Sequence, residues 1–136
     1  MSEIQNAYDE VYVYTMGRPR FILQHVVDAH TAQTVTAASK SIAIVFALVG
    51  LYLHLEKGFE GRPVQQVHER LGRQKRQWPA IALPADRGAM TALDVIAAPP
   101  GPERDAAIDR WCESVWTAFA SSRDAIIRLL AEDGIG

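Results

Sequence analysis

Two of the four histidines in this sequence lie with an aspartate in the stretch QHVVDAH, residues 24–30. His25 and Asp28 are three positions apart, so on an α-helix their side chains are neighbours on one face. His30 lies about 140° further round the helix from His25, because each residue advances a helix by about 100°. The spacing therefore predicts that His25 and Asp28 form half of a site and that His30 faces elsewhere.

The other two histidines, His54 and His68, are expected at the same level of the fold as His25. If the helices that hold the three histidines pack antiparallel through short turns, the side chains come within about one helical turn of one another, roughly 6 Å along the axis. His25 and His68 lie on the apolar stripes of their helices, so both are expected to point inward. We therefore expect His25, Asp28 and His68 to meet in one pocket, with His54 as an optional fourth member.

Imidazole nitrogens together with a carboxylate suit a divalent transition metal, and the residue types do not choose among Zn, Fe, Ni and Cu. Glu-x-x-His pairs in di-iron bundles use the same offset, because two ligands must reach one ion from one rigid helix. The leading hypothesis is a metal site formed by His25, Asp28, His68 and His54. Two alternatives remain open. His25 and Asp28 are the catalytic residues of a metal-free acid–base pair, or the histidines are structural and bond to backbone or carboxylate groups.

Composition limits the size of the fold and its partners. The chain has 136 residues, of which 49% are hydrophobic, and a formal charge of -2. This length supports one core and is short for two domains, so we expect a single helical-bundle domain over residues 1–136. The small negative charge provides no field that would attract nucleic acid or an anionic membrane. The most apolar run, residues 42–53, would span only ~18 Å as a helix, too short to cross a membrane.

The cysteine content and the N-terminus both bear on location. Cys112 is the only cysteine, which excludes an intrachain disulfide and a cysteine-rich zinc site. The N-terminal residues MSEIQNAYDE lack the basic and apolar segments of a signal peptide. Both features predict a cytoplasmic protein.

Apolar residues recur at helical spacing over most of the chain, and no stretch shows the alternation of a β-strand. Thr36 and Ser39 are candidate N-caps of the third helix. Pro63 suits the first turn of the fourth helix, and Thr91 suits the N-cap of a short one. We therefore predict an all-α, single-domain bundle of four main helices plus a short extra helix in a proline-rich loop, residues 78–102. The expected helical ranges are 4–15, 20–35, about 39–57, 63–77, 91–97 and 102–132.

The third helix has two contrasting faces. Small residues at Ala43, Ala47 and Gly50 favour the close approach of a neighbouring helix. The opposite face is larger than a two-layer bundle needs, so it is a candidate homodimer contact. Its members are Ile44, Leu48, Leu51 and Leu55.

The stretch RLGRQKRQW, residues 70–78, combines basic residues with a tryptophan, a composition that can hold phosphates and stack a base. One short basic run in an acidic chain is more typical of a solvated helix end, where cations favour the negative end of the helix dipole. We therefore expect no nucleic-acid partner.

Three segments of the chain resemble a bacterial family of small helical proteins known mainly as a domain of unknown function. They are YDEVYVYTMGRPRFILQHVVDAHTAQ, LVGLYLHLEKGFEGRPVQQVHERL and QWPAIALPADRGAMTALDVIAAPPGPERDAAIDRW. The resemblance implies no activity, but it favours His25, Asp28 and His68 over His30 and His54. The positions typical of that family are Gln24, His25, Asp28, Gln33, His68, Trp78 and Pro79.

Two functions are compatible with these features. The first is a metal-binding or metal-assisted enzyme with a small-molecule ligand. In it Gln24 or Gln33 would bind the ligand or a bound water, and Trp78 with Pro79 would cover the pocket. The second is a non-catalytic interaction protein, a homodimer whose histidines are hydrogen-bonded in the core.

Elemental analysis of protein purified without an affinity tag separates these two functions. A metal site predicts near-stoichiometric metal in the wild type and its loss in a His25→Ala/His68→Ala double variant. A metal-free chain whose stability is the same with and without a chelator contradicts the metal hypothesis.

Overall fold

Every regular element is helical in residues 2–135, the part of the chain that the computed structural model describes. This range contains no strand and no helix long and apolar enough to cross a membrane. The all-α fold class is therefore confirmed. The α-helices are α1 (Glu3–Met16), α2 (Leu23–Thr34), α3 (Ser41–Lys57), α4 (Gly61–Gly72), α5 (Ala92–Ala97), α6 (Pro102–Ala118) and α7 (Arg123–Glu132), with short 3-10 helices at Pro19–Phe21 and Ala120–Ser122.

The prediction of four main helices is wrong in number. Among the described residues, six α-helices have ten or more residues, and α5, with six, is the short helix in the proline-rich loop. One cause is that the single helix expected over 102–132 is two helices, α6 and α7, with a break at Ala120–Ser122. The apolar residues keep helical spacing across this break, so their pattern does not reveal it.

The break allows α7 to turn back toward α3, and Glu56 near the end of α3 anchors the turn. The Glu56 carboxylate accepts a hydrogen bond from Trp116 Nε1 on α6 at 2.8 Å and one from Arg123 Nη2 at 2.6 Å. Arg123 is the first residue of α7. One side chain of α3 therefore fixes the helices on both sides of the break.

Two of the predicted helix starts have different outcomes. Thr91 is the N-cap of α5 and forms a capping box with Asp94, as the sequence predicts. The prediction for α3 is wrong, because Lys40 occupies its N-cap position. The Ser39 hydroxyl instead accepts from the backbone N–H of Thr36 at 3.1 Å, so it closes the preceding turn rather than capping the helix.

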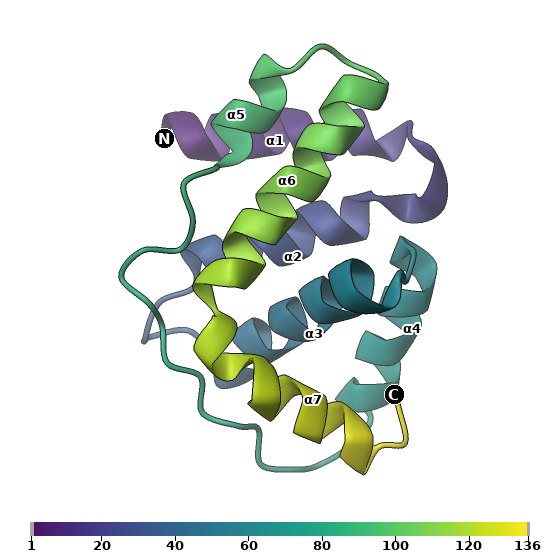
Figure 1. Ribbon diagram of the computed structural model, residues 1–136, viewed down its shortest axis with the longest axis vertical. Helices are drawn as coiled ribbons and strands as arrows, with labels where there is room; N and C mark the ends of the chain where they lie inside the picture. Colours follow the sequence, from purple (N-terminus) through teal and green to yellow (C-terminus); the bar gives the residue numbers. More distant parts are fainter. Residues whose placement is uncertain (1, 136) are drawn as a thin grey trace.

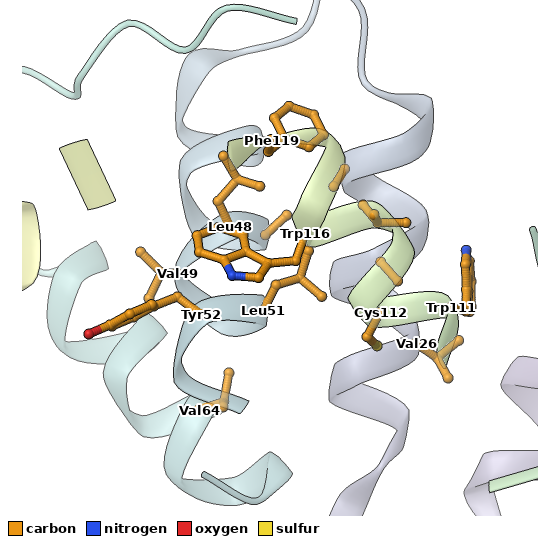
Figure 2. Close-up of a cluster of buried hydrophobic side chains, with 14 of the residues drawn as sticks. Val26, Leu48, Val49, Leu51, Tyr52, Val64, Trp111, Cys112, Trp116 and Phe119 are labelled. Atoms are coloured by element: carbon orange, nitrogen blue, oxygen red, sulfur yellow. The ribbon is translucent and has the colours of Figure 1, made fainter. Parts of the chain in front are cut away.

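The packing is organised around α2 and α3, which lie side by side, while α6 crosses both (Figure 1). The remaining helices cover this arrangement, with α1 and α5 packed together on one side and α4 and α7 against α3. Figure 2 shows the core that results, in which Leu48 and Leu51 of α3 lie beside Trp116 of α6, while Trp111 and Cys112 lie toward Val26 of α2.

The apolar face of α3 is part of this core. Ile44, Leu48 and Leu51 are 4%, 0% and 1% exposed, so the face that we considered for a homodimer contact is covered by the chain's own helices. The reason is that α6 and α7 both pack on α3. The two-layer bundle assumed from the sequence did not include this additional packing on α3. Only Leu55 of the proposed contact is partly exposed.

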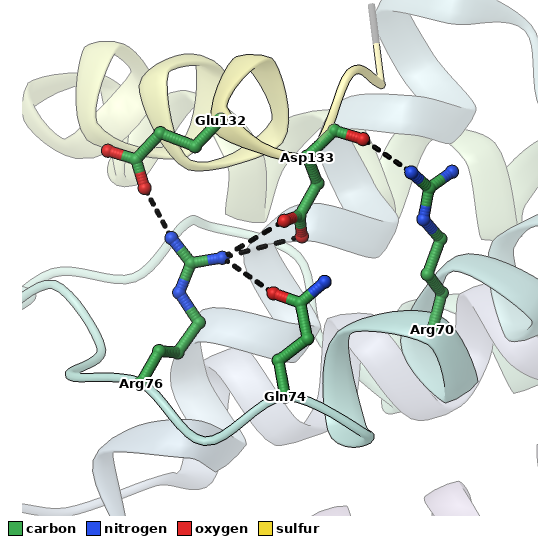
Figure 3. Close-up of polar contacts among 5 residues, drawn as sticks. All are labelled: Arg70, Gln74, Arg76, Glu132 and Asp133. Atoms are coloured by element: carbon green, nitrogen blue, oxygen red, sulfur yellow. Dashed lines mark hydrogen bonds and ion pairs between the residues drawn. The ribbon is translucent and has the colours of Figure 1, made fainter.

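The basic stretch at the end of α4 holds the C-terminal end of α7. Arg76 bonds to Glu132 and reaches both carboxylate oxygens of Asp133 at 3.4 Å, while Arg70 donates to the backbone carbonyl of Asp133 (Figure 3). Gln74 accepts from Arg76 at 3.2 Å. Arg70 and Arg76 therefore connect the end of α4 and the segment after it to the last helix.

The side chain of Asp28 on α2 lies directly against Gly50 on α3. A Cβ atom added to Gly50 would lie 1.8 Å from Asp28 Oδ2. Only glycine leaves room for the carboxyl group against the helix backbone here. The predicted close packing at the small residues of α3 is thus present at Gly50.

A Gly50→Ala variant tests this constraint. Alanine normally favours a helix over glycine by about 1 kcal/mol, but overpacking against Asp28 is expected to reduce the free energy of unfolding by roughly 1–3 kcal/mol. The measurement is urea unfolding followed by circular dichroism.

Gly72→Ala is the matched control, because a Cβ there meets only the Phe46 ring at an ordinary 3.8 Å. The double variant Gly50→Ala/Asp28→Ala should show a coupling that recovers part of the loss. A Gly50→Ala protein as stable as the wild type would contradict the proposed steric constraint.

Candidate functional site

The predicted site residues lie in two groups. His25 lies against His54 at a cleft, whereas Gln24, Asp28 and His68 form a buried chain of polar contacts beside it. The expected convergence of histidines is therefore real for His25 and His54, but His68 belongs to the second group.

His25 and His54 stack face to face, with ring centroids 3.5 Å apart and planes 14° from parallel. His54 is held at both nitrogens, with Nδ1 at 3.1 Å from the Phe59 carbonyl oxygen and Nε2 at 2.8 Å from Asp109 Oδ1. The partner of Nε2 is a carboxylate oxygen, so this nitrogen donates the hydrogen in the contact with Asp109. His54 is therefore an oriented donor to Asp109.

The stacked rings open onto a cleft of about 250 Å³ where α2, α3 and α6 come together. The side chain of Asp109 is 59% exposed, so its carboxylate faces solvent and the cleft at once. The cleft is lined by Pro19, Arg20, Ile22, His25, His54, Gly58, Phe59, Glu60, Asp105, Ile108 and Asp109.

His25 is neutral at physiological pH. Burial and, to a smaller extent, the adjacent His54 lower its pKa to about 3, although Asp109 acts in the opposite direction. Its Nδ1 atom is buried and has no hydrogen-bond partner among residues 2–135. A buried imidazole with a strongly shifted pKa beside a cleft is typical of functional sites.

Asp28 is buried in the second group and is held by Gln24. Gln24 Nε2 donates to Asp28 Oδ1 at 3.1 Å and faces His68 Nδ1 at 3.5 Å. His68 Nε2 lies 2.7 Å from the Phe46 carbonyl oxygen, so this nitrogen carries the hydrogen and Nδ1 is the acceptor. Burial raises the pKa of Asp28 well above its ordinary value, and Asp28 Oδ2 has no partner within the described chain.

The arrangement of the described side chains gives no support to the predicted metal ligands. Residues 2–135 contain no group of three or more His, Cys, Asp or Glu side chains placed to hold an ion. Both ring nitrogens of His68 face protein groups, and Asp28 is directed at Gln24 and Gly50. The metal set of His25, Asp28, His68 and His54 therefore has no support from the arrangement of the side chains.

Gln33 anchors the long loop between α4 and α5 instead of facing the cleft. Its Nε2 donates to the Met90 carbonyl at 2.6 Å, and its Oε1 accepts from Trp111 Nε1 at 2.9 Å. Arg87 of the same loop donates to the free carbonyls at the end of α2, including that of Ala32 at 3.2 Å. The Arg87 bonds satisfy helix-end groups, while Gln33 ties the end of α2 to the loop and to α6.

Trp78 lies over Phe46 and not over the histidine cleft. Its ring meets Phe46 edge to face at a centroid distance of 5.5 Å, and Phe46 in turn stacks on His68 at 5.1 Å. Trp78 therefore covers the His68 side of the buried group. His30, set aside on spacing, stacks on Tyr8 of α1 at 3.6 Å.

The residues that the sequence reasoning missed come mainly from α6 and from the turn before α2. Asp105 and Asp109 are four positions apart on α6, a pattern that usually marks a solvated face. Asp105 is tied to the turn by Arg18 Nη2 at 2.6 Å and to α1 by Tyr14 Oη at 2.6 Å. Burial alone would raise the pKa of Asp105, but the hydrogen bonds from these two side chains outweigh it and lower the pKa.

Comparison with known proteins gives a family for this chain. Residues 5–120 match a family of unknown function, DUF5946. The chain belongs to this family. Neither the comparison with curated proteins nor that with solved structures finds a match. Membership of DUF5946 confirms the resemblance noted in the sequence and assigns no activity to the cleft.

The pKa of His25 predicts how stability depends on pH. The folded protein keeps His25 neutral down to about pH 3, whereas an unfolded histidine binds a proton near pH 6.5. The unfolded state therefore binds more protons between these values, so this contribution is complete above pH 6.5 and is lost as the pH falls, by at most ~1.4 kcal/mol per pH unit. In the His25→Phe variant, the free energy of unfolding should therefore fall less between pH 7 and pH 5 than in the wild type. Chemical denaturation at each pH measures this difference.

Asp28→Asn is the control, because the Asp28 contribution to stability changes with pH in the opposite direction to that of His25. The raised pKa of Asp28 means that the folded state holds the proton longer, so its contribution is complete below the unfolded value and is lost as the pH rises. Relative to Asp28→Asn, the wild type should lose stability as the pH rises, whereas relative to His25→Phe it should lose stability as the pH falls. Equal slopes in all three proteins would contradict both assignments.

Proposed function

We propose that the histidine cleft binds a small polar molecule and that Asp109 takes a proton from it. The observation that supports this proposal is the stacked pair of His25 and His54 in a cleft with Asp109. Three titratable side chains from α2, α3 and α6 meet there, and one has a strongly lowered pKa. Such a cluster in a concave site is the usual starting point for an active-site hypothesis.

Each side chain has a separate task in this proposal. Asp109 is the catalytic base, because one of its oxygens is held by His54 at 2.8 Å while the carboxylate stays exposed to the cleft. His54 is a positioning residue, since both its ring nitrogens contact protein oxygens and one of these contacts holds Asp109. Neutral His25 stacks on the ring of His54 and forms the wall of the cleft beside it.

The proposal retains part of the function predicted from the sequence. It keeps His25 in a His/Asp pocket between helices with a small-molecule ligand, but Asp109 replaces Asp28 as the reactive carboxylate. Asp28 is buried against Gly50 and does not line the cleft. The cleft volume of about 250 Å³ is near the lower end of the range for ligand pockets, which favours a small metabolite-sized ligand.

Base-promoted ring opening of a nitrobenzisoxazole tests the proton-transfer step without knowledge of the natural substrate. The reaction requires only that a base remove one C–H proton, and it releases a coloured phenolate. We expect the wild type to exceed the buffer rate, and Asp109→Asn to lose about 10²–10⁴-fold of that excess, the usual contribution of a positioned base. The initial rate is followed by absorbance across pH 5 to 9.

Glu113→Gln is the matched control, because Glu113 is an exposed acid one turn further along α6 and does not line the cleft. It should react at the wild-type rate. If the histidines are purely structural in a non-catalytic protein, then wild type, Asp109→Asn and Glu113→Gln will all react at the buffer rate, and that result would overturn the proposal.

A further inference from the structure

The turn between α1 and α2 contains two consecutive residues in the left-handed region, neither of them glycine. Arg20 has φ 65° and ψ 14°, and Phe21 has φ 51°. Such backbone angles are unfavourable for residues with a side chain and persist only where the surroundings enforce them. They also explain why α2 begins at Leu23 and not at Arg20, where the sequence places its start.

The first turn of α4 enforces this conformation. A Cβ atom on Gly61 would lie 1.9 Å from the Phe21 carbonyl oxygen, so the two backbones touch. The Arg62 guanidinium lies over the Phe21 ring, 3.8 Å from its centroid. Phe21 is therefore held from the backbone side and from the ring side.

The strained turn places Arg20 at the junction of two clefts. Arg20 lines the histidine cleft and also a neighbouring cleft of about 460 Å³. Glu60 lines both clefts as well. Arg18, Phe21 and Arg62 also line the second cleft.

Arg20 differs from the other two arginines of this region in having no internal partner. Arg18 is paired with Asp105 at 2.6 Å, and Arg62 donates to Gln65 at 3.0 Å in addition to its contact with Phe21. Arg20 makes no hydrogen bond or ion pair with any residue in the range 2–135. Asp105 is near enough for the charge of Arg20 to lower the pKa of its carboxyl group, but Asp105 is bonded to Arg18. The donors of the Arg20 guanidinium are therefore free to bind a molecule that enters either cleft.

We propose that Arg20 binds the carboxylate of the molecule whose other end reaches His25 and Asp109. This inference rests on the proposed function, because it names the class of ligand for the same cleft. A planar guanidinium can bind a carboxylate through two parallel hydrogen bonds. Glu60 and Asp109 line the same cleft and repel a second negative charge, so the site selects a monocarboxylate over a phosphate dianion.

Glycolate and glycolamide form a matched pair of probes, since they differ only in the charged group. Each is titrated into ¹⁵N-labelled protein while the amide signals of the cleft residues are followed. We expect glycolate to bind the wild type roughly ten- to a hundredfold more tightly than glycolamide. In Arg20→Gln the affinity for glycolate should fall to that for glycolamide, and Arg73→Gln, at an exposed arginine outside both clefts, should leave it unchanged.

Arg20→Gly separates ligand binding from a structural role. Glycine relieves the unfavourable φ at this position, so the melting temperature should rise while glycolate binding is lost. Loss of both stability and binding would instead show that Arg20 supports the fold, and would overturn the assignment.

Three other results would also overturn it: equal affinity of the wild type for glycolate and glycolamide, tighter binding of inorganic phosphate than of glycolate, or no shift with any of the three. The nitrobenzisoxazole rate distinguishes these failures from failure of the proposed function. A wild-type rate above buffer that depends on Asp109 retains the function and rejects only the carboxylate.

Discussion

The close approach of α2 and α3 at Asp28 and Gly50 sets the geometry of the rest of the site. Because the Gly50 position has no side chain, the Asp28 carboxyl group can lie against the α3 backbone. His25 is about one turn before Asp28, and His54 about one turn after Gly50, so two antiparallel helices at this separation bring the rings together. Their centroid distance of 3.5 Å depends on a contact one turn away.

The same approach has an electrostatic cost. It removes Asp28 from water, which raises the pKa of its carboxyl group, and it places His25 where burial and His54 lower the pKa of the imidazole. Both pKa shifts favour the neutral form of the side chain. The strained turn at Arg20 and Phe21 adds about 1–3 kcal/mol for each unfavourable residue. The residues that carry these unfavourable contributions lie around the histidine cleft, on one side of the molecule. The core in Figure 2, by contrast, is apolar.

Local sequence patterns predicted the helices more successfully than their packing. Apolar spacing located α1 to within one or two residues, and the Thr91 capping box marked the start of α5. The assumed antiparallel packing placed His25 level with Gly50, whereas the structure puts Asp28 there and His25 against His54. This shift of about one turn matters because it places His54, instead of Gly50, beside His25. Turn lengths alone do not fix such a register, because a few residues of loop change it by a whole turn.

The place of Asp109 in the site could not be predicted from the sequence for a different reason. It depends on the angle at which α6 crosses α2 and α3. The sequence shows only an acid on the polar side of an amphipathic helix, and many such acids are solvated. The residues typical of the family pattern mainly hold elements together: Gln24 joins Asp28 to His68, Gln33 anchors the long loop, and Trp78 covers Phe46. Of that set, His25 alone lines the cleft. A pattern of polar residues can therefore mark the framework that positions a site, while the reactive group comes from a helix outside the pattern.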